Sequence, residues 1–332
     1  MMCFSDQGGI NMSCFKQILA IVVIVCMGLC FCLNASQKKQ FVIGFSQVTT
    51  TEPWRLLFNK ELRDEASKYP EIKLIVRDGK DDIFKQIADI EDFIRMKVDA
   101  ILISPKTASE PTSVINKAHS LKIPVIVLDR DISNDHYTQF IGGDNQKIGH
   151  AAGDYIVSLL GGKGKAKGNI LEIWGGKRST PAQDRHQGFY EIVSQESGIK
   201  LLGEGKDGDW KQDKAYEIMV DAIDTFPKID VVYAHNDPMA FGAYMAAKDA
   251  DIHKSIRFFG IDGIPMEGVR WVHEGILTAT FLYKTPGDEG IRQAMRLLLK
   301  GETLQKRISL PTLVIDKTNA HKILEKNGLL KK

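Results

Sequence analysis

Cysteine is missing from almost the whole chain. The 332 residues include five cysteines, and all of them lie within the first 32 positions: Cys3, Cys14, Cys26, Cys30 and Cys32. The rest of the chain therefore has no thiol for a disulfide bond, for a cysteine-ligated zinc site or for a cysteine nucleophile.

Recognisable catalytic and metal-binding patterns are missing too. The sequence contains no G-x-S-x-G nucleophile motif and no H-E-x-x-H pair, and its histidines lack the spacing of metal ligands. The glycine-rich segment at residues 161–168 does not end in Gly-Lys-Ser/Thr, and it precedes a predicted strand where a phosphate-binding loop follows one. The sequence predicts no enzyme, no metal site and no cofactor.

Neither sign of charge dominates. Lys and Arg total 44 against 42 Asp and Glu, so there is no large basic surface of the kind that binds nucleic acid. We expect a small, roughly neutral ligand and no nucleic-acid partner.

An apolar run near the N-terminus predicts export. Lys16 precedes the run at residues 18–33, and polar residues 34–39 follow it, as in a secretory signal. The run has 16 residues, fewer than the roughly 20 of a membrane span. Residues 1–36 are interpreted as a signal peptide, with an uncleaved membrane anchor, or a lipid on Cys30 or Cys32, as the alternatives. Either Met1 or Met12 can be the true start.

Strands and helices alternate beyond residue 40. Strands are predicted at residues 41–46, 72–76, 100–103, 125–128, 169–174, 199–202 and 230–234, with helices between them. Such alternation builds parallel sheets with helices on both faces. A second series begins after Asp144, and no flexible linker separates the two series. This pattern predicts two similar α/β lobes.

Four apolar runs end abruptly in polar residues. They occupy residues 101–104, 125–130, 231–237 and 258–263. Runs of this kind are typical of strands buried in parallel sheets, which bind ligands beyond their carboxyl ends. The polar tips are therefore candidate ligand-binding residues: Asp129, Arg130, Asn236, Asp237 and Asp262. Their alternative role is to cap a helix or form a turn.

Two tryptophans occupy corresponding places in the two series. Trp54 follows the loop after the first strand, and Trp210 stands at the entrance of a helix in the second series. A sugar has apolar faces that suit flat aromatic rings, and a hydroxyl rim that suits planar charged groups such as Arg130 and Arg185. Core packing is the alternative role for each tryptophan.

Seven short segments together resemble a known family. In order and spacing they are similar to the periplasmic sugar-binding proteins of the ribose and galactose class, above all to the galactofuranose-binding type. The resemblance extends from residue 41 to about residue 324, and it is carried by residues 44–48, 53–55, 128–130, 184–185, 208–210, 234–237 and 260–263.

The resemblance implies the type I periplasmic binding protein fold. In that fold two doubly wound parallel-sheet lobes are joined by a hinge of three crossings, expected here near Gly143, Tyr283 and Leu310. The first lobe would comprise residues 41–143 and 284–310, and the second residues 144–283 and 311–328.

The resemblance also assigns roles around one monosaccharide. Trp54 and Trp210 would sandwich the ring, while Arg55 and Arg130 of the first lobe would bind rim hydroxyls. The further candidates are Arg185, Asn236 and Asp262 in the second lobe, together with Asp129, Asp144, Asp237 and Tyr283.

Some positions depart from the family pattern. Arg55 replaces the second aromatic residue of the ribose-binding type, as it does in the galactofuranose-binding type, and this disfavours ribose. Glu52 and Pro53 stand where the galactofuranose-binding type has small residues, and Tyr283 stands where the ribose-binding type has Gln. These differences leave the identity of the sugar open.

The implied function is that of an exported solute-binding protein. It would be a monomer in the periplasm or cell envelope that presents a sugar to the membrane permease of an ABC transporter. One alternative is a sugar sensor read by a membrane histidine kinase or chemoreceptor. A regulator of the lactose-repressor class is disfavoured, because no helix-turn-helix precedes the first strand.

Overall fold

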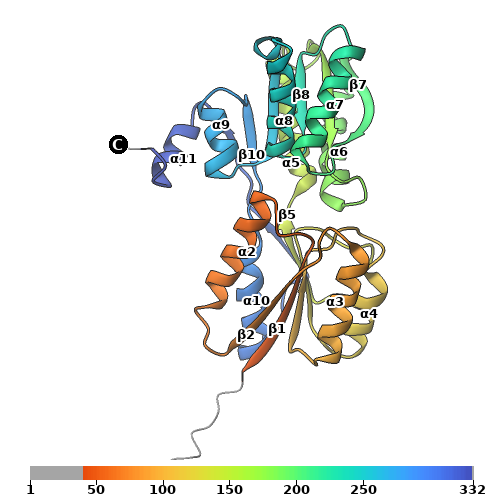
Figure 1. The fold of residues 1–332 in the computed structure, drawn as a ribbon, viewed down its shortest axis with the longest axis vertical. Helices are drawn as coiled ribbons and strands as arrows, with labels where there is room; N and C mark the ends of the chain where they lie inside the picture. The colour runs from red at the N-terminus through yellow and green to blue at the C-terminus, as the bar shows by residue number, and fades with distance from the viewer. Residues whose placement is uncertain (1–39, 331–332) are drawn as a thin grey trace, which may run out of the picture. The chain divides into compact units, whose positions relative to one another are not determined.

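The strands of this protein form two separate six-stranded sheets, seen in Figure 1 within a computed structural model that describes residues 40–330. The predicted signal peptide, residues 1–36, lies outside the described residues. Within residues 40–330 we find no helix with the length and apolar character that crossing a membrane requires.

The first sheet is entirely parallel. Its strand order is β11 (Arg307–Leu310), β5 (Gln139–Gly143), β4 (Val125–Leu128), β3 (Ala100–Ile103), β1 (Phe41–Gln47) and β2 (Ile72–Asp78). Its helices are α2 (Pro53–Ala66), α3 (Ile83–Arg95), α4 (Thr112–Ser120) and α10 (Gly287–Lys300). In Figure 1, α2 and α10 lie together on one face and α3 and α4 on the other.

The second sheet repeats this plan with one antiparallel edge. Its order is β12 (Val314–Asp316), β10 (Ala279–Leu282), β9 (Arg257–Asp262), β8 (Val231–Ala234), β6 (Lys167–Trp174) and β7 (Gly198–Asp207), and only β12 runs antiparallel. Its main helices are α5 (Asn145–Leu159), α6 (Thr180–Val193), α7 (Gln212–Thr225) and α8 (Asp237–Asp249), with the short α9 (Arg270–His273) and α11 (Ala320–Lys326) beside β12. The predicted pair of doubly wound lobes is confirmed.

The strands are apolar on both faces because helices cover both faces. In β4, Ile126 and Leu128 pack in the core formed with α2 and α10, whereas Val125 and Val127 pack in the core formed with α3 and α4. All four side chains are buried. Because successive side chains of a strand point to opposite faces, this burial requires a continuous apolar run.

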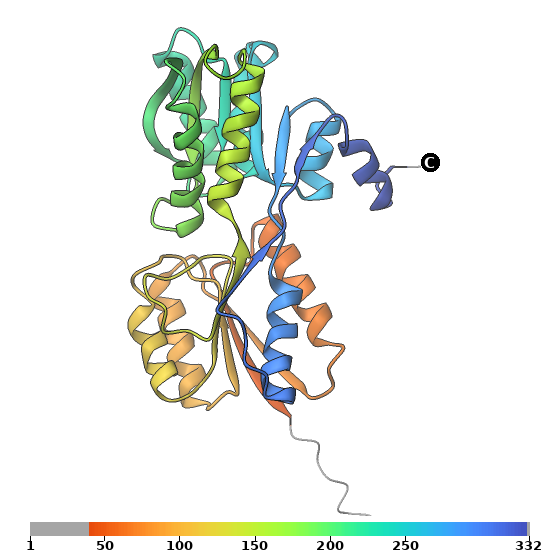
Figure 2. The same cartoon turned by 180° about the vertical axis from the view of Figure 1, so that it is seen from behind.

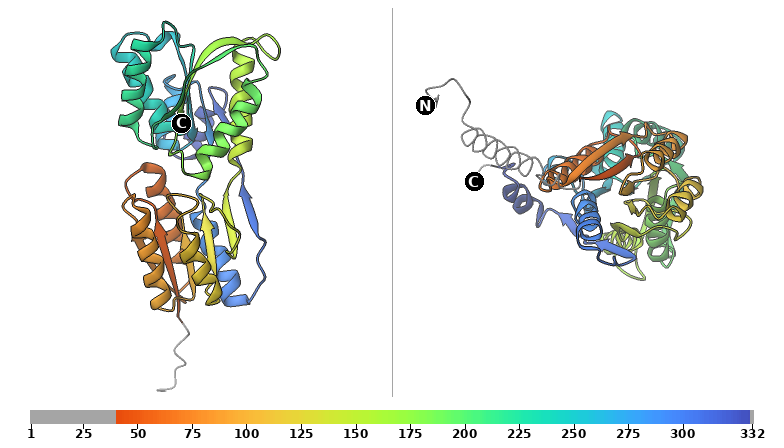
Figure 3. Two further views of the ribbon diagram at one scale, coloured as in Figure 1. Left: turned by 90° about the vertical axis from the view of Figure 1, so that its right-hand side faces the viewer. Right: turned by 90° about the horizontal axis from the view of Figure 1, so that it is seen from below.

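The chain passes between the two sheets three times. It leaves the first sheet after β5 and enters α5, returns after β10 to α10, and crosses again between β11 and β12. Figure 2 shows these connections from behind, and Figure 3 shows β11 lying along β5 at the edge of the first sheet. The carboxyl ends of the parallel strands of both sheets lie at the level of these crossings.

Gly143 at the first crossing makes room for the ring of Tyr283 at the second crossing. Gly143 ends β5, and a Cβ atom on it would lie 2.4 Å from Cε2 of Tyr283, which directly follows β10. A methyl group cannot fit at this distance, so any larger residue would push the Tyr283 ring out of place.

We therefore expect Gly143→Ala to lower the free energy of unfolding by about 1–3 kcal/mol, as overpacking does. Urea denaturation measures this change. The matched control is Gly168→Ala, whose Cβ would lie 3.1 Å from the end of the Leu160 side chain and 3.4 Å from the Asp230 carboxylate, contacts that a small side-chain shift relieves. Equal effects of the two substitutions would contradict the packing argument.

Candidate functional site

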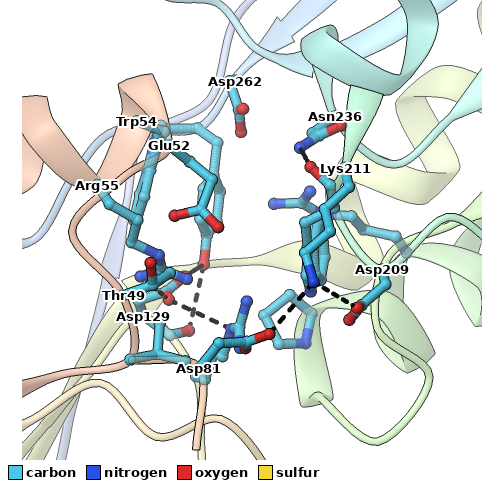
Figure 4. A pocket seen from close by; sticks show the side chains of 16 residues that line it. Thr49, Glu52, Trp54, Arg55, Asp81, Asp129, Asp209, Lys211, Asn236 and Asp262 are labelled. Atoms are coloured by element: carbon cyan, nitrogen blue, oxygen red, sulfur yellow. Dashed lines mark hydrogen bonds and ion pairs between the residues drawn. The ribbon is translucent and has the colours of Figure 1, made fainter. Parts of the chain in front are cut away.

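A pocket lies between the two sheets, beyond the carboxyl ends of their strands. It is lined from both sides, as Figure 4 shows, by Val48, Thr49, Glu52, Trp54, Arg55, Asp81, Asp129, Arg130, Pro181, Arg185, Asp209, Trp210, Lys211, Asn236, Asp262 and Tyr283. The space within it that is open to the centres of water molecules is about 50 Å³.

Most of the residues predicted from the sequence line this pocket: Trp54, Arg55, Asp129, Arg130, Arg185, Trp210, Asn236, Asp262 and Tyr283. They come from strand ends, helix starts and a crossing that are far apart in the chain. The fold brings them together because parallel strands end at a common edge of each sheet.

Backbone strain is concentrated in the lining. Several non-glycine residues of the pocket have positive φ angles: Asp81 at 57°, Asp129 at 66°, Asp209 at 50°, Trp210 at 67° and Asp262 at 134°. Each such conformation costs about 1–3 kcal/mol, and strain of this kind gathers at functional sites. The clustering supports a functional role for this pocket.

Asp129 of the first lobe has hydrogen-bond donors for both of its carboxylate oxygens. Its Oδ2 atom accepts hydrogen bonds from Arg55 Nη1 at 2.7 Å and from Ser104 Oγ at 3.0 Å, and its Oδ1 accepts one from the Tyr283 hydroxyl at 2.9 Å. Burial alone would raise the pKa of Asp129, but Arg55 and Arg130 outweigh this effect and hold the pKa below its usual value. Asp129 is therefore a carboxylate anion that positions its partners.

Arg130, in contrast, has few partners. Its side chain is 8% exposed, and it donates one hydrogen bond of 3.3 Å to the Lys106 carbonyl and lies 3.8 Å from Asp129. Burial and the like charge of Arg55 lower the pKa of Arg130 to about 10. Most of its donors remain free to bind a ligand.

An aromatic wall joins α2 to the second crossing. The rings of Trp54 and Tyr283 stack with centroids 5.3 Å apart and an interplanar angle of 25°, and Trp54 Nε1 donates to the Tyr283 carbonyl at 2.8 Å. The Arg55 guanidinium lies 4.7 Å from the centre of the Trp54 ring. Trp54 therefore has partners in this wall as well as a place in the pocket lining.

The ring of Trp210 lies close to one arginine of each lobe. The Cζ atoms of Arg130 and Arg185 lie 5.3 Å and 5.4 Å from the centre of its ring. A Cβ on Gly175 would lie 2.4 Å from the Trp210 ring, so the glycine backbone packs directly against the ring. The indole Nε1 is buried and has no hydrogen-bond partner among the described residues.

Arg185 is 1% exposed and forms no ion pair in the described part of the chain. Its Nε donates to Asn145 at 2.9 Å, and its Nη1 donates to the His235 carbonyl. These bonds orient the guanidinium but leave some of its N–H donors without an acceptor. A buried charge in this state is unfavourable unless a further partner binds.

The carboxylate of Asp262, in contrast to the Arg185 guanidinium, is an acceptor that lacks a donor among the described residues. It is 7% exposed, and no residue between 40 and 330 donates a hydrogen bond to its carboxylate. Burial, and next to it the charge of Asp237, raises the pKa of Asp262 well above its usual value. Together, Asp262 and Arg185 offer one acceptor-rich and one donor-rich group to the same small space.

The amide of Asn236 is already used within the protein. Its Oδ1 accepts from the Met239 backbone at 3.0 Å and so caps α8, and its Nδ2 donates to the Trp210 carbonyl at 3.1 Å. Asn236 therefore lines the pocket and also positions the loop that carries Trp210.

Two of the predicted ligand-binding residues, Asp144 and Asp237, are not in the pocket lining. Asp144 is exposed, and its carboxylate caps α5 by accepting from the Lys147 backbone at 3.0 Å. Asp237 is fully buried below the pocket and accepts from Thr280 Oγ1 at 2.6 Å and from the Gly263 backbone at 2.8 Å. Both carboxylates have local structural partners outside the pocket lining, and their role in ligand binding stays a prediction.

Sequence reasoning missed a charged network at the mouth of the pocket. Lys211 Nζ of the second lobe lies 3.3 Å from Asp81 of the first lobe and 3.0 Å from Asp209. Asp81 also pairs with Lys106 at 3.0 Å. Asp81 lies shortly beyond the end of β2, so applying the strand-tip rule to that strand could have found it. Lys211 directly follows Trp210 in the sequence. Glu52 and Thr49 line the pocket as well and were not predicted to bind the ligand.

Metal ligation has no support in the described residues. Between residues 40 and 330 no group of three or more His, Asp or Glu side chains is arranged to hold a metal ion.

The chain belongs to the family described as periplasmic binding protein domain, whose model matches residues 43–303. This match and the relatives below together confirm the resemblance to the ribose and galactose class.

Individual relatives agree with this membership. The chain is 30% identical to the ribose import binding protein RbsB of Bacillus subtilis (strain 168) over 280 residues, 84% of this chain and 88% of the relative. It is 34% identical to the galactofuranose-binding protein YtfQ of Escherichia coli (strain K12) over 231 residues, 67% of this chain and 71% of the relative.

Solved structures match the fold closely. The fructose binding periplasmic domain of the hybrid two component system BT1754 superposes with a TM-score of 0.82 at 40% identity, covering 87% of this chain and 95% of the other. A galactofuranose binding protein superposes with a TM-score of 0.81 at 29% identity, covering 87% and 98%. These matches confirm the predicted type I fold.

The buried role of Asp237 gives a direct test. Asp237→Ala should lower the free energy of unfolding by about 2–4 kcal/mol, because the Gly263 and Thr280 donors lose their acceptor and each unmet buried group costs about 1–3 kcal/mol. Asp144→Ala removes only a helix cap and should cost about 1 kcal/mol. Urea denaturation of both variants measures the difference, and a harmless Asp237→Ala would rule out the structural role.

Proposed function

We propose that this protein is an exported solute-binding protein that encloses one neutral monosaccharide between its two lobes. The observation that carries the proposal is the unmet hydrogen-bonding capacity of Arg130, Arg185 and Asp262, which meet in one pocket beside Trp210. A hydroxyl group both donates and accepts, so a ring bearing several hydroxyls can satisfy guanidinium and carboxylate groups together.

The charge of the lining supports a neutral ligand. Its cationic side chains are Arg55, Arg130, Arg185 and Lys211, and its acidic side chains are Glu52, Asp81, Asp129, Asp209 and Asp262. The two sets nearly balance. A strongly charged ligand would upset this balance in a buried space.

Aromatic surfaces from both lobes support a sugar in particular. Trp54 lies at the start of α2 in the first lobe and Trp210 lies before α7 in the second. Rings on two sides suit the apolar C–H faces of a furanose or pyranose. We propose that the ring binds between these two residues, and that Arg55, Asp129 and Tyr283 support the first-lobe side of the site.

The proposed mechanism is hinge closure. Residues of both lobes line the pocket, and the Lys211–Asp81 ion pair of 3.3 Å joins the lobes beside it. We propose that the crossings after β5, after β10 and after β11 act as the hinge. A ligand that contacts both lobes then stabilises the closed form through its differential affinity, and closure is the output.

Delivery of the sugar to the permease of an ABC transporter is the use we propose for this closure. A second candidate is sensing through a membrane histidine kinase or chemoreceptor, and it is favoured by the 40% identity to the periplasmic domain of a hybrid two component system. The genes encoded next to this one distinguish the two: a permease and an ATPase favour transport, and a kinase favours sensing.

A thermal-shift screen of the protein tests the proposal. The probes are D-fructose, D-ribose, D-galactose, L-arabinose and myo-inositol. A ligand present at 100 times its dissociation constant adds about 2.7 kcal/mol of stability, which is a clear rise in melting temperature. Absence of a shift with every probe would count against sugar binding.

The pocket residues predict the effect of truncation. Trp54→Ala and Arg185→Ala should each weaken binding of the best probe by roughly 2 kcal/mol or more, about 30-fold, as truncation of central binding residues does. Calorimetry measures the affinities. Arg95→Ala, at a side chain 69% exposed on α3, is the control, and unchanged affinity in both pocket variants would overturn the site assignment.

The charged network at the mouth predicts a salt-dependent contribution to closure. Lys211 joins the lobes through Asp81, whereas the neighbouring Lys214 pairs only with Asp209 of its own lobe, at 3.0 Å. The Lys211–Asp81 pair is partly exposed, so it is worth at most about 1 kcal/mol and is screened by salt.

Lys211→Met should therefore weaken binding of the best probe up to about fivefold in 20 mM NaCl, and much less in 0.5 M NaCl. Lys214→Met should have little effect at either concentration. Calorimetry at both salt concentrations measures this, and equal losses in the two variants would show that bridging the lobes is not the cause.

A further inference from the structure

Glu52 lines the pocket without any structural use for its side chain. It stands directly before Pro53 at the start of α2, with extended backbone angles of −74° and 144°. The position is that of a helix cap, but the Glu52 side chain makes no capping hydrogen bond. Glu is also not among the residues preferred for capping, so local structure gives no reason for this residue type.

The carboxylate of Glu52 is left without a donor. Its Oε2 atom is buried and has no hydrogen-bond partner within residues 40–330, and no cationic side chain of that range lies within ion-pair distance. Figure 4 shows the carboxylate directed into the space between the two walls of the pocket. A buried acceptor left in this state is costly, and the cost is recovered when a donor arrives.

The surroundings indicate the kind of donor. Arg130 interacts with Glu52 through charge but forms no bond with it. A ligand hydroxyl between the two could donate to Glu52 and accept from Arg130 at the same time. An ammonium group is a poorer fit, because Arg55, Arg130, Arg185 and Lys211 already line the same pocket.

We propose that Glu52 is a specificity-determining residue that accepts a hydrogen bond from one hydroxyl of the bound sugar. The inference rests on the function proposed above and adds which residue selects among sugars. A sugar without a hydroxyl at that place leaves the carboxylate unpaired and is rejected, since a site built to bond a hydroxyl discriminates strongly against ligands that lack it.

Stability of the ligand-free protein provides the first test. Glu52→Gln keeps the size of the side chain and removes the unpaired charge, so it should raise the melting temperature by about 2 °C. Glu217→Gln on the exposed side of α7 is the matched control and should leave the melting temperature unchanged. A fall, or no change, in Glu52→Gln would mean that the carboxylate is satisfied within the protein and would overturn the proposal.

Selectivity provides the second test. Affinities for D-fructose, D-ribose, D-galactose, L-arabinose and myo-inositol are measured by calorimetry for the unchanged protein, Glu52→Gln and Glu52→Ala. We expect at least a tenfold loss for the best probe in Glu52→Ala, and a smaller loss in Glu52→Gln, whose amide oxygen still accepts a hydrogen bond. The affinities of the weakly bound probes should change less than threefold, so that the preference among sugars narrows.

The outcomes separate the two proposals. Equal losses for all bound sugars, or no loss, would overturn the role of Glu52 while leaving sugar binding in place. Failure of the unchanged protein to bind any of the five probes would instead overturn the proposed function, and the selective role of Glu52 with it.

Discussion

The buried carboxylate of Asp129 is the constraint on which the pocket depends. Asp129 directly follows β4 in a left-handed backbone conformation, and its carboxylate receives hydrogen bonds from Arg55 of α2, from Ser104 after β3 and from Tyr283 at a crossing. A buried anion without such partners would be strongly unfavourable. One charge thus holds a strand tip, a helix start and the segment joining the lobes in a single arrangement, and the Trp54–Tyr283 stack is built on it.

The polar groups of the pocket differ in how far they are satisfied within the protein. Arg55 and Asp129 pair with each other and form a fixed frame in the first lobe. Arg130, Arg185 and Asp262 retain unused donors or acceptors while being largely removed from water, and one oxygen of Glu52 is buried without a donor among the described residues. Such groups cost stability in the ligand-free protein and repay it when a polar ring binds. The strained backbone of Asp129, Trp210 and Asp262 in the same pocket likewise lowers stability where the ligand is expected to bind.

Periodicity predicted both lobes, because helices on two faces force continuous apolar strands and this requirement is visible in the chain. The strand-tip rule also located Asp129 and Asp262 at the pocket. The rule does not separate Asp237 from these two, since a buried carboxylate that receives backbone donors occupies the same place in a sequence as one that faces a ligand. The resemblance likewise pointed to Asp144, whose carboxylate caps α5. The short strands β5, β10, β11 and β12 were not located, because their few residues carry too weak a pattern.

The sequence by itself determined the class of fold, the common edge at which the site would form and most of the residues gathered there, because these depend on local periodicity and on strand direction. Only the tertiary structure decided which charges are already satisfied. The Lys211–Asp81 pair joins residues 130 positions apart, and Trp54 bonds a carbonyl 229 positions away. No local pattern encodes such partners, and whether a buried charge is paired depends on them. Glu52 is the clearest case, because the lack of a hydrogen-bond donor for its buried oxygen among the described residues is evident only once the surrounding pocket residues are placed.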